Sequence, residues 1–378
     1  MSELIETNNK RATVRWKLLA SVSALALTAN LVSMAKAEEA DHPQVWIELG
    51  GQLERLSGES VPFTPSFFAL ASPADIQTMT EAQQPSHWAL GGEGKITLTP
   101  KGTDWVFSAA IRYGRSNNSR RLHHQSPFPS VEKYVLPFIQ PTTHPLVRAI
   151  LSDAKARSEE THAVLDFMAG KDVGLGMFGA KGESVVSAGV RFAQFTSHAN
   201  TTLYARPVEE LNIVTPIPGK YKWAHPFYQT YTAVLHAEHS THAVGPSLSW
   251  EASLPIVGNG ADSELTVDWG VNGAVLFGRQ RANIYHQTTS YDYYLTIGTN
   301  HVTHHSTQTV NRKRARTAVI PNVGGFAGFS LKFPNAKVSV GYRADFFFNA
   351  VDNGIDTRHT ANEGFYGPFA SISMGLGG

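Results

Sequence analysis

Apolar and polar residues alternate with a period of two along much of this chain, and no other feature constrains its fold as strongly. The clearest segment is LTVDWGVNGAVLF, residues 265–277, whose apolar side consists of Leu265, Val267, Trp269, Val271, Val275 and Phe277. Successive side chains of a β-strand point to opposite faces of the sheet. The sequence therefore predicts an all-β fold in which each strand has one apolar and one polar face.

The same pattern predicts ten strands, one after another along the chain. They are expected at residues 45–53, 92–98, 105–113, 162–175, 184–195, 229–255, 265–277, 322–333, 337–348 and 365–376. The segment 229–250 is long enough for two strands. We interpret it as one strand that projects beyond a bilayer, because this keeps both ends of the chain on the same side.

The connections between these strands alternate in length. The short ones are 99–104, 178–183, 255–264 and 333–336, and the long ones are 54–87, 116–160, 198–227, 279–316 and 350–364. Outer-membrane barrels have short periplasmic turns and longer extracellular loops. The sequence predicts a transmembrane antiparallel up-and-down β-barrel of about ten strands with this arrangement.

The apolar faces decide between a membrane barrel and a secreted soluble β-sandwich. A sandwich would turn its apolar faces inward, away from water. Here the second faces carry Gly, Ser, Asp, Arg and Asn, which suits a polar lumen, and the apolar faces are expected to meet lipid. Aromatic residues near the strand ends suit interfacial girdles: Trp88, Trp105, Tyr113, Phe277, Phe333, Phe348 and Tyr366.

The first 37 residues have the features of a cleavable secretory signal peptide. Four basic residues precede an apolar run over 18–34, and Ala35-Lys36-Ala37 supplies an A-x-A cleavage pattern at Ala35 and Ala37. A short N-terminal membrane anchor is the alternative. We expect residues 38–378 to form a single barrel domain in the bacterial outer membrane.

Composition limits the classes of function. Residues 1–37 hold five Lys or Arg and two Asp or Glu, so the remainder has 27 basic and 29 acidic residues. This balance gives no support to nucleic-acid binding. The chain has no Cys, so any oligomer is not disulfide-linked.

Several segments resemble the family of bacterial outer-membrane barrels related to the Legionella major outer membrane protein. The resemblance rests on DFMAGKDVGLGMFG (166–179), SAGVRFAQF (187–195), GPSLSWEASLP (245–255), LTVDWGVNGAVLFGRQ (265–280) and the C-terminal segment from GYRADFFF onward. It extends from about residue 44 to the end of the chain. The resemblance implies a pore-forming barrel and does not identify a solute.

The polar faces carry charges of both signs, which we predict to line the lumen. The candidate pore-lining residues are Glu93, Arg112, Asp166, Arg191, Asp268, Asn272, Arg343 and Asp345. Opposed charges across a lumen can sort small polar solutes. The leading hypothesis is a small passive pore. A non-conducting structural or adhesion barrel, in which acids and bases pair and fill the lumen, is the alternative.

Other motifs lead to weaker hypotheses. PLVRAILSDAKAR (145–157) has the pattern of a short helix in a long loop that either constricts the lumen or lies on the surface. The basic run NRKRARTAV (311–319) would bind lipopolysaccharide phosphates or form a solvated patch. Histidines cluster at 123–124, 236–242 and 301–305, and we interpret them as solvated loop residues, not as metal ligands.

The sequence contains no catalytic motif that we recognise, so an outer-membrane enzyme is the least favoured class, and no cofactor or metal is expected. The expected partners are outer-membrane lipid, lipopolysaccharide and the barrel-assembly machinery.

Overall fold

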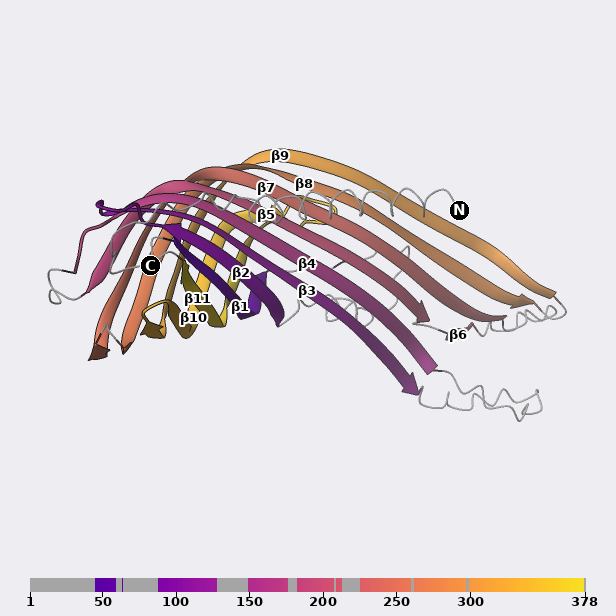
Figure 1. Cartoon of the computed structure of the whole chain (residues 1–378). Helices are drawn as coiled ribbons and strands as arrows, with labels where there is room; N and C mark the ends of the chain where they lie inside the picture. Colours follow the sequence, from indigo (N-terminus) through magenta and orange to yellow (C-terminus); the bar gives the residue numbers. More distant parts are fainter. Residues whose placement is uncertain are drawn as a thin grey trace, which may run out of the picture. The chain divides into compact units, whose positions relative to one another are not determined.

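The computed structural model describes residues 45–58, 63, 88–127, 149–175, 182–206, 209–212, 225–259, 262–296 and 299–376. The predicted signal peptide and its cleavage site at Ala35 and Ala37 lie outside these residues. All regular structure in the described part of the chain is β-strand (Figure 1). None of the described residues belongs to a helix with the length and apolar character to cross a membrane.

Eleven strands form one antiparallel sheet. They are β1 (Val45–Gly58), β2 (Ala89–Leu98), β3 (Trp105–Pro127), β4 (Ala149–Asp172), β5 (Glu183–Arg206), β6 (Glu209–Asn212), β7 (His225–Asn259), β8 (Ser263–Thr296), β9 (Thr299–Phe333), β10 (Ala336–Asp352) and β11 (Thr360–Leu376). Each long strand pairs with its sequence neighbours, and β1 pairs with β11. The pairing of β5 with β7 closes ten of the strands into a barrel, and β6 is a short addition to the edge of β7.

The predicted strands agree with the observed ones in number and order around the barrel. The segment 229–250 lies within the single strand β7, as expected. Four short connections, 99–104, 173–182, 260–262 and 334–335, join strands at one end of the barrel. We refer to this end as the turn end and to the other as the loop end.

Three of the predicted long loops are wrong, because strands continue through most of them. Residues 279–316 form the far halves of β8 and β9, which stay paired up to Thr296 and Thr299. Likewise β3 and β4 extend into 116–160, and β5 and β7 extend into 198–227. Figure 1 shows these six long strands, β3, β4, β5, β7, β8 and β9, running past the shorter β1, β2, β10 and β11. We call their projecting parts the extended wall.

The predicted helix at 145–157 is also wrong over its described part. Residues from Ala149 onward belong to β4 and pair with β3. Ala154 and Ala156 are buried whereas Lys155 and Arg157 are exposed. This is the two-residue period of a strand, and the register with β3 outweighs the local helical propensity of the alanines.

The side chains on the outer face of the barrel are mainly large and apolar near the turn end. Leu49, Leu248 and Phe329 are 63%, 65% and 56% exposed. Six of the seven predicted girdle aromatics are also exposed, and Tyr366 is partly buried. We call this outward apolar surface the apolar band.

The alternation inverts on the extended wall. There the inward side chains are apolar and buried, including Tyr231, Leu235 and Ile284, and they pack with Phe63 and with Ile355. The outward side chains, such as Arg281 and Asn283, are polar and exposed. The wall therefore has the face polarity of a protein in water, opposite to that of the apolar band.

Candidate functional site

All eight predicted pore-lining residues lie on the inner face of the barrel at the level of the apolar band, where most of them are joined by ion pairs. Asp166 on β4 is the centre of this network. Its carboxylate accepts hydrogen bonds from Arg191 Nε at 2.6 Å and Nη2 at 3.0 Å. Arg112 Nη2 lies 3.8 Å from the same carboxylate. Arg112 also donates to Asp345 on β10.

The network continues from Arg191 past β7 to β8 and β9. Arg191 Nη1 donates to Asn272 Oδ1 on β8 at 2.7 Å and also to Asn322 on β9. Arg191 is only 4% exposed, and its guanidinium therefore has almost no contact with solvent. Side chains from β3, β4, β5, β8, β9 and β10 thus meet inside the lumen and connect its walls.

Two further ion pairs cross the lumen. Arg343 on β10 pairs with Glu93 on β2, and its guanidinium lies 4.8 Å from the ring centroid of Phe369, a cation–π distance. Nearer the turn end, Lys95 on β2 donates to Glu251 on β7 at 2.8 Å. Because β3, β4 and β5 separate β2 from β7 in the sheet, this pair joins distant parts of the wall.

Asp268 has a separate set of partners. Lys337 Nζ lies 2.6 Å from its carboxylate, and the hydroxyls of Ser253, Thr266 and Ser330 donate to it. A buried charge with one counter-ion and three hydrogen bonds is well satisfied. Asp268 therefore anchors neighbouring strands β7, β8, β9 and β10 to one another.

An apolar layer lies above the ion pairs, toward the loop end. Phe195, Phe347 and Phe365 from β5, β10 and β11 form its centre, with ring centroids 4.9 Å apart for Phe195 and Phe347 and 6.0 Å for Phe195 and Phe365. Leu276 and Ile320 belong to the same buried cluster. The alternation of apolar and polar residues does not predict this layer. One feature of the sequence does point to it: Phe195 lies on the same strand face as the inward-pointing Arg191, and Phe347 on the same face as Asp345.

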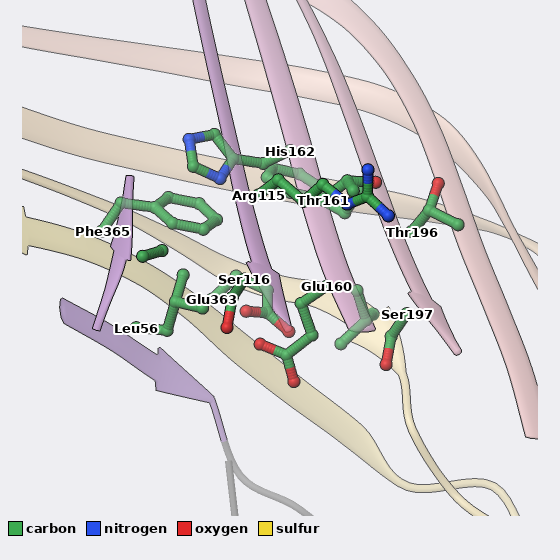
Figure 2. Close-up of a pocket in the computed structure, with 13 residues that line it drawn as sticks. Leu56, Arg115, Ser116, Glu160, Thr161, His162, Thr196, Ser197, Glu363 and Phe365 are labelled. Atoms are coloured by element: carbon green, nitrogen blue, oxygen red, sulfur yellow. The ribbon is translucent and has the colours of Figure 1, made fainter. Parts of the chain in front are cut away.

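A small cavity borders this layer, and Figure 2 shows the carboxyl groups of Glu160 and Glu363 close together in it. Its volume of about 20 Å³ has room for one water molecule. Burial raises the pKa of both carboxyl groups, and for Glu363 the nearby charge of Glu160 raises the pKa further. Oε2 of Glu160 is buried without a hydrogen-bond partner among the described residues.

Other charged groups near the cavity have partners elsewhere. Arg115, which also lines it, forms an ion pair with Glu159 at 2.7 Å. His162 Nε2 lies 3.4 Å from Oε2 of Glu54, and both side chains are about 95% buried. Glu160 and Glu363 are therefore left facing one another.

The basic run at 311–319 holds the connection between β10 and β11 in place. Arg312, Arg314 and Arg316 alternate along one face of β9. Arg314 donates to the carbonyl oxygens of Ile355 at 2.9 Å and Gly354 at 2.5 Å. Arg312 donates to the Asp356 carbonyl at 2.5 Å, and Arg316 donates to Thr360 Oγ1 at 3.2 Å. Arg314 and Arg316 are therefore partly buried donors to this connection, whereas Arg312 stays exposed beside it.

Two buried histidines also contact this connection. One of them, His239, belongs to the clusters predicted to be solvated, and that prediction is wrong for His239, which is 5% exposed. His286 Nε2 lies 2.9 Å from Asp356 Oδ1, and His239 Nε2 lies 3.4 Å from the Gly354 carbonyl oxygen. Burial lowers the pKa of His239. In the described part of the chain, no group of three or more His, Asp or Glu side chains is arranged to hold a metal ion. The side chains of His124 and of 301–305 lie outside the described residues.

Comparisons with known proteins give no family. No family model matches the chain, and no curated protein matches it. The transport unit of the autotransporter AIDA-I from Escherichia coli is 7% identical with a TM-score of 0.23, over 94% of this chain and 98% of that chain.

Two other solved structures are similarly distant. The Pseudomonas putida toluene transporter TodX is 7% identical with a TM-score of 0.19, over 89% of this chain and 91% of that chain. A bacterial polysaccharide outer membrane secretin is 9% identical with a TM-score of 0.19, over 89% and 99%. TM-scores at this level carry no argument, so the fold rests on the strand pairing alone.

Removal of one buried carboxyl group should stabilise the barrel at neutral pH. The raised pKa of Glu363 means that its ionised form is disfavoured in the folded protein, so stability is lost as the pH rises above the ordinary value of 4.5. Glu363→Gln should raise the urea midpoint of refolded protein at pH 7 and leave it unchanged at pH 4. Glu238→Gln, on the outward face of β7 and away from the cavity, is the control. A variant less stable than wild type at pH 7 would contradict this account.

Loss of the Arg314 clamp should release the β10–β11 connection. Arg314→Met keeps most of the side-chain volume but leaves two carbonyl oxygens without their donor, at a cost of about 2–3 kcal/mol. The exposed Arg358 should then be cleaved by trypsin at least tenfold faster than in wild type. Lys313→Met, on the outward face of the same strand, should not change the cleavage rate. Equal rates in all three proteins would show that the clamp does not restrain the connection.

Proposed function

We propose that this chain is an outer-membrane β-barrel whose lumen is held closed by ion pairs between its walls. The observation that carries this proposal is the direct pairing of charged side chains from distant strands, above all Arg112 with Asp345 and Lys95 with Glu251. A conducting lumen needs a continuous column of water. Here the width of the lumen is occupied by side chains that satisfy one another.

The membrane location is supported by the apolar band and by the closure of the sheet. Water is absent from the bilayer core, so every backbone donor and acceptor there needs a protein partner, which a closed barrel provides. The large exposed side chains on the band would be unfavourable in water over so wide a surface. On this proposal residues 1–37 are a signal peptide, and the barrel-assembly machinery inserts the remaining chain.

The turn end is the periplasmic end on this proposal, because short turns lie there and both ends of the described chain, Val45 and Leu376, are adjacent. The extended wall then stands outside the cell. Its outward polar surface and inward apolar surface suit that position. The size of this wall favours an adhesive or structural role over a catalytic one.

A small passive pore is the second candidate. Charges of both signs along the inner face favour it, because Arg191, Arg343 and their acidic partners would sort ions by charge if their pairs opened. In a passive pore the ion pairs and the apolar layer would open to leave a path for water, whereas in the closed barrel they block the lumen. Conductance across a bilayer therefore distinguishes the two candidates.

A lipid-facing charge tests the location of the apolar band. Val340 on β10 is 53% exposed and lies near the middle of the band. Val340→Arg should destabilise the barrel by about 2–4 kcal/mol in lipid vesicles, measured by urea unfolding, because arginine is costly at the bilayer midplane. Ser119→Arg, on the outward face of the extended wall, should change stability by no more than about 0.5 kcal/mol. Equal effects at both positions would argue against lipid at the band.

Planar-bilayer recording tests the closed lumen. Wild-type protein should insert without producing discrete conductance steps. A triple variant with Arg112→Ser, Phe195→Ser and Phe347→Ser removes the Arg112–Asp345 pair and two of the three phenylalanines at the centre of the apolar layer. It should conduct with a preference for cations, because Asp166 and Asp345 remain. Heat-modifiable gel migration confirms that the variant is folded.

The outcome for the wild-type protein decides between the candidates. Discrete steps from wild-type barrels would reject the closed lumen and favour the passive pore. In that case Arg191→Glu and Arg343→Glu should each shift ion preference toward cations.

A further inference from the structure

The apolar band has a well-defined upper edge on β7, β8 and β9. Val244, Phe277 and Val319 lie opposite one another in the register, and all three are at least 41% exposed. Beyond them, toward the loop end, no large apolar side chain is exposed on the described outward faces of these three strands. If lipid covers the band, its headgroups lie at and just above this row.

Two arginines occupy the next two outward positions of β8. Arg279 follows Phe277 by two residues and Arg281 by four, so their Cα atoms are about 7 Å apart along one face. Both side chains are exposed. On β9 their outward neighbours across the ladder are small: Thr317 lies opposite Arg279, and Ala315 lies opposite Arg281. On β7 the exposed ring of His242 lies opposite Arg279, and Ser240 lies opposite Arg281. Nothing bulky on β9 covers the two guanidinium groups.

These arginines differ from the basic residues on the other side of the extended wall. Arg115 and Arg121 on β3 are each neutralised by a carboxylate, Glu159 at 2.7 Å and Asp153 at 2.6 Å. Neither Arg279 nor Arg281 forms an ion pair within the described ranges of the chain. Glu238, the nearest acid by register, lies one row further from the band, opposite Asn283.

A third cation lies near the two arginines, one row further from the apolar band. Lys313 on β9 lies opposite Asn283 and is exposed on the same outward face. The sequence motif that contains it, NRKRAR, thus divides between two faces of β9. Arg312, Arg314 and Arg316 turn inward to the β10–β11 connection, and Lys313 turns outward beside the β8 arginines.

We propose that Arg279, Arg281 and Lys313 bind the phosphate groups of lipopolysaccharide. This inference rests on the proposed membrane location and goes beyond it by naming a lipid partner and its site. Guanidinium groups bind phosphate through paired, charge-assisted hydrogen bonds. Two of them about 7 Å apart, next to a lipid-facing surface, match a headgroup that carries more than one phosphate.

The end of the barrel at which the site lies selects lipopolysaccharide over phospholipid. The three cations are on the loop-end side of the apolar band, which is the external side of an outer-membrane barrel. The external leaflet of that membrane is built from lipopolysaccharide, whose glycolipid core is phosphorylated. Phospholipid headgroups would meet the barrel mainly at its turn end, where these cations are absent.

The test measures binding of purified lipopolysaccharide to the folded full-length barrel in detergent. Wild type should bind intact lipopolysaccharide at least tenfold more tightly than the same material after enzymatic removal of its phosphates. The double variant Arg279→Ser, Arg281→Ser should lose this difference. Arg157→Ser, an exposed arginine on β4 further from the band, should bind as wild type does.

Separate measurements distinguish failure of this inference from failure of the proposed function. Flotation with lipid vesicles and heat-modifiable migration report insertion and folding, and both should be the same in wild type and the double variant. A double variant that binds intact lipopolysaccharide like wild type would overturn the site. Equal wild-type affinity for phosphatidylglycerol micelles would overturn the choice of lipopolysaccharide. A wild-type protein that does not float would instead reject the membrane location.

Discussion

The hydrogen-bonded ladder between β5 and β7 is the interaction on which the other features of this structure depend. It runs from Glu183 opposite Ser253 to Ala205 opposite Tyr231 and converts a sheet with two open edges into a closed barrel. Closure at ten strands fixes a narrow interior, between a fully packed eight-stranded barrel and an open sixteen-stranded one. Arginine and lysine side chains are long enough to cross such an interior. The ion pairs inside the barrel are therefore a geometric consequence of strand number combined with the placement of charges on the inner faces.

The face polarity changes along each long strand because the strand passes between two environments. In the apolar band the outward side chains are large and apolar and the inward ones are mostly polar or small, as in β8 from Leu265 to Phe277, whose inner face carries Asp268 and Asn272. On the extended wall the inward side of the same strand carries Ala282 and Ile284, and the outward side carries Arg279 and Arg281. The two-residue period does not break at this change, so the strand continues without a turn. Only the sign of the alternation changes.

This inversion explains how much the sequence alone could predict. Strand order, the single strand through 229–250 and the inward placement of Arg191 and Asp345 follow from the period of two. The pattern of outward apolar residues does not predict the far halves of β8 and β9, because the outward residues there are polar. Two other features, the apolar layer of Phe195 and Phe347 and the partners of each lumenal charge, depend on which strands face one another across the barrel. Local alternation contains no information about contacts between residues more than 200 positions apart, such as Arg112 and Asp345.

The same reasoning accounts for the basic run on β9. The extended wall is formed by six strands, whereas β1, β2, β10 and β11 end lower, so the wall alone does not enclose its buried inner face. The connection after β10 fills part of this gap: Ile355 joins the apolar cluster of the wall, and its carbonyl oxygen accepts a hydrogen bond from Arg314. Backbone carbonyl oxygens brought against an apolar surface need donors. Arginines at every second position of β9 supply them, which explains why a cluster of positive charge lies beside a buried apolar face. The cations left for a lipid partner are those on the opposite face of the same sheet.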